Sequence, residues 1–154
     1  METHFTWKTK LFSRTFDILQ YTGKIGELKK EGMSRTTIGE MTGRKIIFRT
    51  KGFFKRETLV TEPDSDTILA IISYKALKSK ATIHYNNKEY HWQFDNFFRT
   101  KWSICSVNGP LIKYYSKTLQ GVIDSYTNDE LLILTGFYIR NYYKQKSEAA
   151  AAST

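Results

Sequence analysis

The sequence has little cysteine and proline and no long hydrophobic run. Its single cysteine, Cys105, excludes a disulfide framework and a zinc site built from four thiolates. The longest apolar segment, residues 131–139, is too short to cross a bilayer, and residues 1–10 lack the apolar region of a secretory signal. We therefore expect a cytoplasmic protein without a transmembrane segment.

What the sequence does have is aromatic residues and positive charge. Aromatic residues make up 15% of the chain, which favours β-strands. The 154 residues carry 24 Lys and Arg against 15 Asp and Glu, which gives a net charge of +9. Residues 1–60 hold 13 of these 24 cations. An excess of this size indicates an anionic partner without naming it.

Turn-forming residues recur about every ten residues, a spacing typical of a β-sandwich or barrel. The clearest hairpin covers residues 80–95, where apolar and polar residues alternate on both sides of Asn86 and Asn87. Asparagine tolerates a positive φ, so these two residues can form a tight two-residue turn. That turn places Ile83 opposite Tyr90 on one apolar face.

A second hairpin is expected from residue 100 to residue 116, around residues 108–110. A strict two-residue turn would mix the two faces of the sheet. A three-residue loop with a glycine bulge places Ile104 opposite Tyr114 instead, and we predict that arrangement.

Residues 128–146 have the pattern of a helix. Asn128 is a suitable N-cap, acidic residues follow it, and lysines lie near the other end. Residues 131–139 show no polar stripe at helical period, so we expect this segment to be buried on every side. Gly136 in its middle indicates a neighbour that packs too closely to admit a methyl group.

About twelve strands followed by one apolar helix have few ways to bury both. A helix on the outside of a sheet would need a polar side, and a barrel of this many strands is too wide for its own side chains to fill. The predicted fold is mainly β, a closed antiparallel barrel of about twelve strands around a central hydrophobic C-terminal helix. Residues 1–146 form this single domain, and residues 147–154 are expected to be a disordered tail.

Three segments, residues 44–54, 102–109 and 130–139, resemble the tubby C-terminal-like superfamily, which includes phospholipid scramblases and the plant LURP-one-related proteins. The resemblance implies a twelve-stranded barrel threaded by a hydrophobic helix. For tubby proteins it also implies phosphoinositide binding through basic residues. The chain lacks the proline-rich region, cysteine cluster and acidic calcium loop of scramblases, so scramblase activity is not expected.

The strongest local feature is a cluster of cations interleaved with phenylalanines. The cations are Arg44, Lys45, Arg49, Lys51, Lys55 and Arg56. On a hairpin around Lys51, alternate cations would share one surface and bind phosphate groups. The alternative interpretation is that these side chains only solvate the outside of the barrel.

Other chemistry is sparse. His84 and His91 fall on the outer face of the first hairpin, where they are either solvated or share a metal ion, and no further ligand is evident. Cys105 is expected to be a small buried hydrophobic residue. No catalytic motif is present, and we expect neither enzymatic activity, a cofactor nor a metal site.

Three functions remain open from the sequence. The first is a non-catalytic tubby-like barrel that binds an anionic partner, such as a phospholipid headgroup or a membrane surface, as a peripheral protein. The second is a barrel that carries a small apolar ligand, which a helix filling the barrel argues against. The third, less favoured, is nucleic-acid binding through the same cations.

Overall fold

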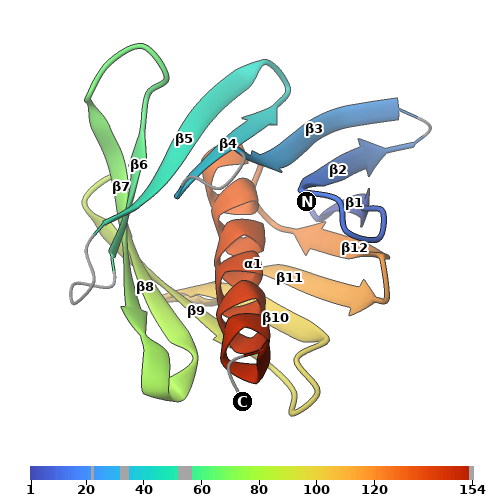
Figure 1. Cartoon of the computed structure of the whole chain (residues 1–154). Coiled ribbons are helices and arrows are strands. Elements are labelled where there is room, and N and C mark those ends of the chain that lie inside the picture. Colours follow the sequence, from blue (N-terminus) through green and yellow to red (C-terminus); the bar gives the residue numbers. More distant parts are fainter. Residues whose placement is uncertain (22, 32–34, 52–56, 153–154) are drawn as a thin grey trace.

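The computed structural model describes residues 1–21, 23–31, 35–51 and 57–152. Within these residues, twelve β-strands form one closed barrel, and a single long helix ends the chain (Figure 1). The strands are β1 (Thr3–Lys8), β2 (Thr15–Gln20), β3 (Gly23–Lys30), β4 (Thr36–Met41), β5 (Arg44–Lys51), β6 (Glu57–Thr61), β7 (Ile68–Lys75), β8 (Lys80–Tyr85), β9 (Lys88–Phe94), β10 (Lys101–Ser106), β11 (Gly109–Lys117) and β12 (Gln120–Ser125). A one-turn 3₁₀ helix η1 (Ala76–Lys78) joins β7 to β8, and helix α1 is Glu130–Ala152.

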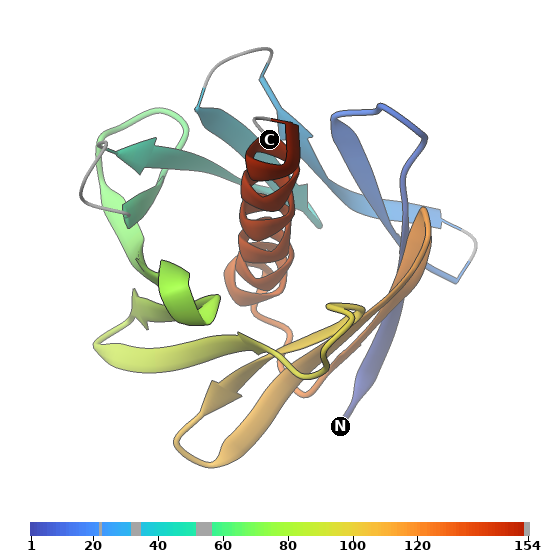
Figure 2. The same cartoon turned by 60° about the horizontal axis from the view of Figure 1, so that its bottom comes forward.

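The strands pair antiparallel in the order of the chain, and β1 pairs with β12 to close the barrel. Helix α1 runs through the barrel, as Figure 2 shows from the side of the helix C-terminus. Residues 131–141 of the helix are all buried. This confirms the fold predicted from the sequence. The helix has no polar side and is buried among the inward-facing residues of the strands. No helix in the described residues is long and apolar enough to cross a membrane.

The N-cap of α1 is Asp129 and not Asn128, so that prediction was wrong. The Asp129 Oδ1 atom accepts hydrogen bonds from the backbone N–H groups of Leu131 (3.0 Å) and Leu132 (3.4 Å). Asp129 immediately precedes the first helical residue, which is the position from which a short acidic side chain reaches these two donors. The side chain of Asn128 instead accepts a hydrogen bond from Thr3.

The helix is longer than the sequence predicted. It continues through Ala152, so residues 147–152 are not the disordered tail that we expected. Four consecutive alanines, residues 149–152, explain the difference because alanine has the highest intrinsic helix propensity. The last two residues of the expected tail lie outside the described part of the chain.

The first predicted hairpin is confirmed in register and in turn. Ile83 pairs with Tyr90 across β8 and β9. Asn86 and Asn87 have φ values of 52° and 58°, the left-handed conformation that a two-residue type I′ turn requires.

The second hairpin has a different register from the predicted one. Ile104 pairs with Ile112 and not with Tyr114, and the turn is formed by residues 107–108. A bulge at Leu111 explains the difference, because one extra residue on β11 restores the alternation of faces that a strict two-residue turn would lose. Ile104 and Ile112 are both fully buried as a result.

Gly136 is a point of tight packing between the helix and the barrel wall. A Cβ atom at this position would lie 2.2 Å from the hydroxyl oxygen of Tyr114. Tyr114 cannot easily retreat, because its ring stacks on Trp102 at 5.4 Å and its hydroxyl donates to the Ile133 carbonyl at 2.8 Å. The sequence-based expectation of a tightly packed neighbour at Gly136 is therefore confirmed.

Candidate functional site

Strand β5 divides the cation cluster expected from the sequence, because successive side chains of a strand point to opposite faces of the sheet. Lys45 and Arg49 are exposed on the outer face of the barrel. They are four residues apart, which corresponds to about 13 Å along a strand. Lys51 is the last residue of β5, and Lys55 and Arg56 lie outside the described residues.

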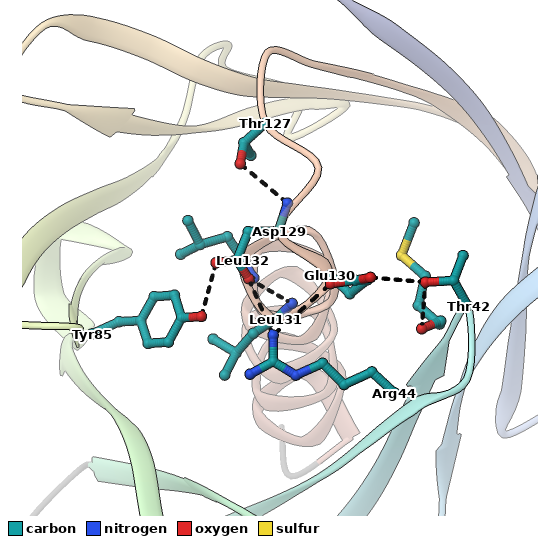
Figure 3. Close-up of polar contacts among 9 residues, drawn as sticks. Thr42, Arg44, Tyr85, Thr127, Asp129, Glu130, Leu131 and Leu132 are labelled. Carbon is teal, nitrogen blue, oxygen red and sulfur yellow. Dashed lines mark hydrogen bonds and ion pairs between the residues drawn. The ribbon is translucent and has the colours of Figure 1, made fainter.

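Arg44 belongs to a different environment at the beginning of β5. Its Nη1 atom lies 3.6 Å from Asp129 Oδ1 and 3.9 Å from Glu130 Oε2, at the N-terminus of the helix (Figure 3). Tyr85 donates its hydroxyl proton to Asp129 Oδ2 at 2.8 Å, and burial together with this bond raises the pKa of Tyr85. Thr42 donates to Glu130 Oε1 at 2.9 Å. Arg44 thus fixes the helix and does not share a surface with Lys45 and Arg49.

The two ends of the barrel carry opposite charge. We call the end that contains the helix N-terminus the acidic end. Its carboxylates in loops and at the start of the helix are Glu2, Glu62, Asp64, Asp66, Asp129 and Glu130. Among the described loop residues of this end there is no lysine or arginine. Two strand-terminal cations, Arg44 and Lys88, oppose these acids.

We call the end that contains the helix C-terminus the basic end. Seven of the twelve strands in the described chain have lysine as the residue nearest this end. These residues are Lys8, Lys30, Lys51, Lys75, Lys80, Lys101 and Lys117. The described loops and the helix add Lys10, Arg14, Arg35, Lys78, Arg99, Lys144 and Lys146. The described carboxylates there are only Glu31, Glu57, Asp95 and Glu148, so the net positive charge of the chain gathers at this end.

The loops of the basic end also expose large apolar side chains. Phe12 in the β1–β2 loop is 95% exposed, and Phe97 in the β9–β10 loop is 91% exposed. Leu11, Leu77 and Phe98 are exposed in the loops of the same end. Apolar side chains such as Tyr21 and Val107 are exposed at the other end as well, but the loops there carry carboxylates. At the basic end the exposed phenylalanines lie among many cations, whereas the exposed tyrosines of the acidic end, Tyr21 and Tyr126, lie on loops whose described residues include no lysine or arginine.

A pocket of about 560 Å³ opens at the basic end, between the helix, the β1–β2 loop with Phe12, and the wall formed by β2 to β5. Its apolar lining includes Phe16 and Leu28 from the wall and Tyr138 and Tyr142 from the helix. Its cationic lining is Lys10, Arg14, Lys30, Arg35 and Lys144. One carboxylate, that of Glu148, lines it. A pocket of this size is within the range of small-molecule sites.

Hydroxyl groups form part of the pocket and the wall behind it. The Tyr138 hydroxyl and Thr50 Oγ1 are 2.9 Å apart, and Thr50 Oγ1 is 3.1 Å from Thr58 Oγ1. Thr58 in turn lies 2.7 Å from the Tyr74 hydroxyl. Burial raises the pKa of both tyrosines, so these groups are neutral hydrogen-bonding partners and not bases at ordinary pH.

The helix face beside the pocket contains a buried arginine. The Arg140 guanidinium lies over the rings of Trp7 (5.4 Å) and Trp102 (5.2 Å), and it donates to Ser116 Oγ at 3.3 Å and to Asn141 Oδ1 at 3.1 Å. Among the described residues no carboxylate lies within ion-pair distance of it. Burial lowers the pKa of Arg140 to about 10, which still leaves it charged near neutral pH.

The remaining sequence-based candidates lie elsewhere. His84 and His91 are exposed on the outer face of β8 and β9, where His91 is 3.7 Å from the carboxylate of Glu89. Cys105 is half-buried beside Ser103. Within the described chain no group of three His, Cys, Asp or Glu side chains is placed to hold a metal ion.

Sequence reasoning missed both the pocket and the basic end. Asn141 and Lys144 were read only as part of the helix, and the β1–β2 loop was not singled out. The strand-end lysines left little signal, because only Lys30 and Lys51 adjoin a turn that the sequence predicts. Grouping them required the knowledge of which turns share one end of the barrel.

Comparison with known proteins gives no relative for this chain: no family model, no curated protein and no solved structure matches it. The kinship with the tubby-like superfamily therefore stays a prediction from the sequence. The fold itself, a closed twelve-stranded barrel in the described residues with one C-terminal helix, is observed independently of that kinship.

Proposed function

We propose that this protein binds anionic membrane surfaces through the basic end of the barrel. The observation that carries the proposal is the coincidence of lysines with exposed Phe12, Phe97 and Phe98 on loops of that end. A cation near an anionic bilayer contributes about 1 kcal/mol of attraction. Aromatic side chains that enter the interface add apolar burial, about 1.5–3 kcal/mol for each phenylalanine that is fully covered.

This proposal changes the position of the anion site that the sequence suggested. Lys51, the last residue of β5, lies at the basic end, and Lys45 and Arg49 lie on the outer wall. Arg44 is excluded from the contact, because its charge is paired with Asp129 and Glu130 at the opposite end. The bound protein would be peripheral, at the cytoplasmic face of a membrane.

Kinship with the tubby-like superfamily, whose tubby members bind phosphoinositides, is part of the same proposal. The shared plan of a barrel around a hydrophobic C-terminal helix supports it. Nucleic-acid binding would use the same cations, but no groove with stacked aromatic residues favours it in the described structure, so it serves as an outcome of the test.

Sedimentation with lipid vesicles tests the proposal. The purified protein should bind vesicles of phosphatidylcholine with phosphatidylserine at low salt, bind less at high salt, and not bind phosphatidylcholine alone. Reversing three exposed strand-end lysines, Lys75→Glu, Lys80→Glu and Lys101→Glu, should weaken binding by a factor of about 100 or more. Phe97→Ser with Phe98→Ser should weaken it at least about tenfold.

The matched control reverses charge away from the basic end. Lys88→Glu with Lys113→Glu changes exposed lysines of β9 and β11, and vesicle binding should fall only slightly. Lys45→Glu with Arg49→Glu tests the outer wall. The proposal is wrong if wild-type protein does not sediment with anionic vesicles at low salt, if the control lowers binding as much as the basic-end variants, or if oligonucleotides bind more tightly than the vesicles.

A further inference from the structure

The pocket beside the helix has features that the binding of a flat membrane surface does not use. The helix approaches the wall closely at Gly39 of β4, where an added Cβ would lie 3.3 Å from Leu134. Toward the helix C-terminus the wall and the helix separate, and the pocket of about 560 Å³ opens between them. A twelve-stranded barrel is wider than one helix can fill, so space on one side of the helix is a consequence of the fold.

The deeper lining of the pocket is apolar and held in place. Phe16 packs edge-on against Phe137 at 5.3 Å, and Leu28 is 1% exposed. The Tyr142 ring stacks on Tyr74 at 3.9 Å. Rigid apolar walls of this kind fit an alkyl chain, which gains about 0.8 kcal/mol for each buried CH₂ group.

Asn141 brings a hydrogen-bond donor into this apolar lining. The residue is only 8% exposed, and it lines the pocket. Its Oδ1 atom accepts from Arg140, which fixes the orientation of the amide. No hydrogen bond in the described structure uses its Nδ2 atom, so two N–H donors are left for an acceptor within the pocket.

The charge around the pocket selects a negative ligand. Five of its lining residues are lysine or arginine, against Glu148 alone. Arg140 adds a buried positive charge next to Asn141, with no carboxylate of the described residues within ion-pair distance. Lys144, on the same side of the helix, lies 3.9 Å from the Glu148 carboxylate, and its pKa is lowered by burial and by the charge of Arg140. An anion in the pocket would relieve the cost of these neighbouring positive charges.

We propose that this pocket binds one molecule of an anionic amphiphile with a single alkyl chain. The chain lies against Phe16, Leu28 and Tyr142, and the carboxylate or phosphate head accepts from Asn141 and meets the cations of the rim. A free phosphate would leave the apolar walls uncovered, and a neutral lipid would bring no negative charge to the five lysine and arginine residues of the lining. This site takes a single molecule and not a surface, so the proposal goes beyond the proposed function and can hold or fail separately.

Calorimetry on the full chain tests the site with four probes below their micelle concentrations. These are palmitate, hexadecyl phosphate, hexadecanol and inorganic phosphate. At least one of the two anionic long-chain probes should bind at a stoichiometry near one, and comparing them tells a carboxylate head from a phosphate head. Hexadecanol should bind at least tenfold more weakly, and inorganic phosphate should give no saturable binding. Equal binding of hexadecanol, or no binding of either anionic probe, would overturn the proposal.

Two variants locate the ligand. Gln145→Trp fills the pocket from an exposed helix position and should abolish binding, whereas Ser147→Trp, exposed on the same helix and not in the lining, should leave it unchanged. Asn141→Asp removes the N–H donors and gives Arg140 a carboxylate, so the protein should stay folded and bind the anionic probe at least tenfold more weakly. Unchanged binding by both folded pocket variants would place the ligand elsewhere.

The same variants separate this site from the membrane surface. Gln145→Trp should sediment with anionic vesicles as the wild type does. Phe97→Ser with Phe98→Ser should lose vesicle binding and keep the affinity for the anionic probe. If each variant affects both assays equally, the pocket is not an independent site and the inference fails.

Discussion

The acidic end and the basic end of the barrel hold the same helix in different ways. At the acidic end, Asp129 joins the helix to the barrel through its cap, the Tyr85 hydroxyl and the ion pair with Arg44. At the basic end, the Tyr138 hydroxyl contacts Thr50 (2.9 Å), Arg140 donates to Ser116 Oγ (3.3 Å), and Lys30 donates to Gln145 in an exposed hydrogen bond. A pocket lies beside these contacts. The comparison teaches that the helix is held along its length, and that exposed cations, exposed phenylalanines and a pocket are assigned to the basic end.

This assignment has a physical reason. The positive pole of the helix dipole meets carboxylates at the acidic end, which is electrostatically favourable. Polar contacts that are satisfied internally do not need a ligand. Cations and apolar side chains that remain exposed do gain from one. The proposals above therefore concern the basic end only.

The largest expected effect comes from overpacking the contact between the helix and the barrel wall. Gly136→Ala forces a Cβ to within 2.2 Å of the Tyr114 hydroxyl. Overpacking of a rigid site outweighs the gain in helix propensity, and we expect a loss of about 3 kcal/mol in the free energy of unfolding. Urea unfolding measures it. Gly23→Ala is the control, because an added Cβ there has nothing within 4 Å. A Gly136→Ala protein as stable as the wild type would show that the helix is not fixed here.

The next effect tests the anchor at the acidic end. Asp129→Ala removes the cap of the Leu131 and Leu132 N–H groups and the acceptor of the Tyr85 hydroxyl. We expect a loss of about 2 kcal/mol in the free energy of unfolding, about one from the cap and about one from the hydrogen bond. Asn128→Ala, the cap that the sequence suggested, should change stability by less than about 0.5 kcal/mol. Thermal and urea unfolding of both variants measure the change in stability. Equal losses of stability would contradict Asp129 as the N-cap.

Most of the fold was predictable from the periodicity of apolar and polar residues. The absence of a polar stripe in residues 131–139 was enough to place the helix inside a barrel, and Gly136 marked a point of tight packing. The Asn86 and Asn87 turn was predictable because both residues accept a positive φ. These features depend on local sequence, so a single chain reveals them.

Other features depend on contacts that a single sequence does not specify. Asn128 and Asp129 are equally good caps by residue type, and only the exact first residue of the helix selects between them. The bulge at Leu111 was not visible, because a three-residue loop already satisfied the pattern of apolar residues. The cations around Lys51 are near in sequence but divided by the two faces of β5, whereas the strand-end lysines are far apart in sequence and gathered by antiparallel pairing.

The smallest expected effect on stability sharpens the comparison most. Lys30→Ala removes the exposed hydrogen bond to Gln145 at the basic end, and the free energy of unfolding should change by less than about 0.5 kcal/mol, because water replaces an exposed partner. The same variant should weaken binding to anionic vesicles by about fivefold, since one cation near the surface is lost. Unfolding and sedimentation on one protein sample measure the two values.

A loss of stability as large as that of Asp129→Ala would mean that the exposed bond of Lys30 also anchors the helix. In that case a ligand or membrane at the basic end would have to compete with this bond. If stability stays and vesicle binding falls, the exposed side chains of the basic end are free to vary without endangering the barrel. Recognition can then be altered there at little structural cost, because the helix is held toward this end by buried groups such as Tyr138 and Arg140.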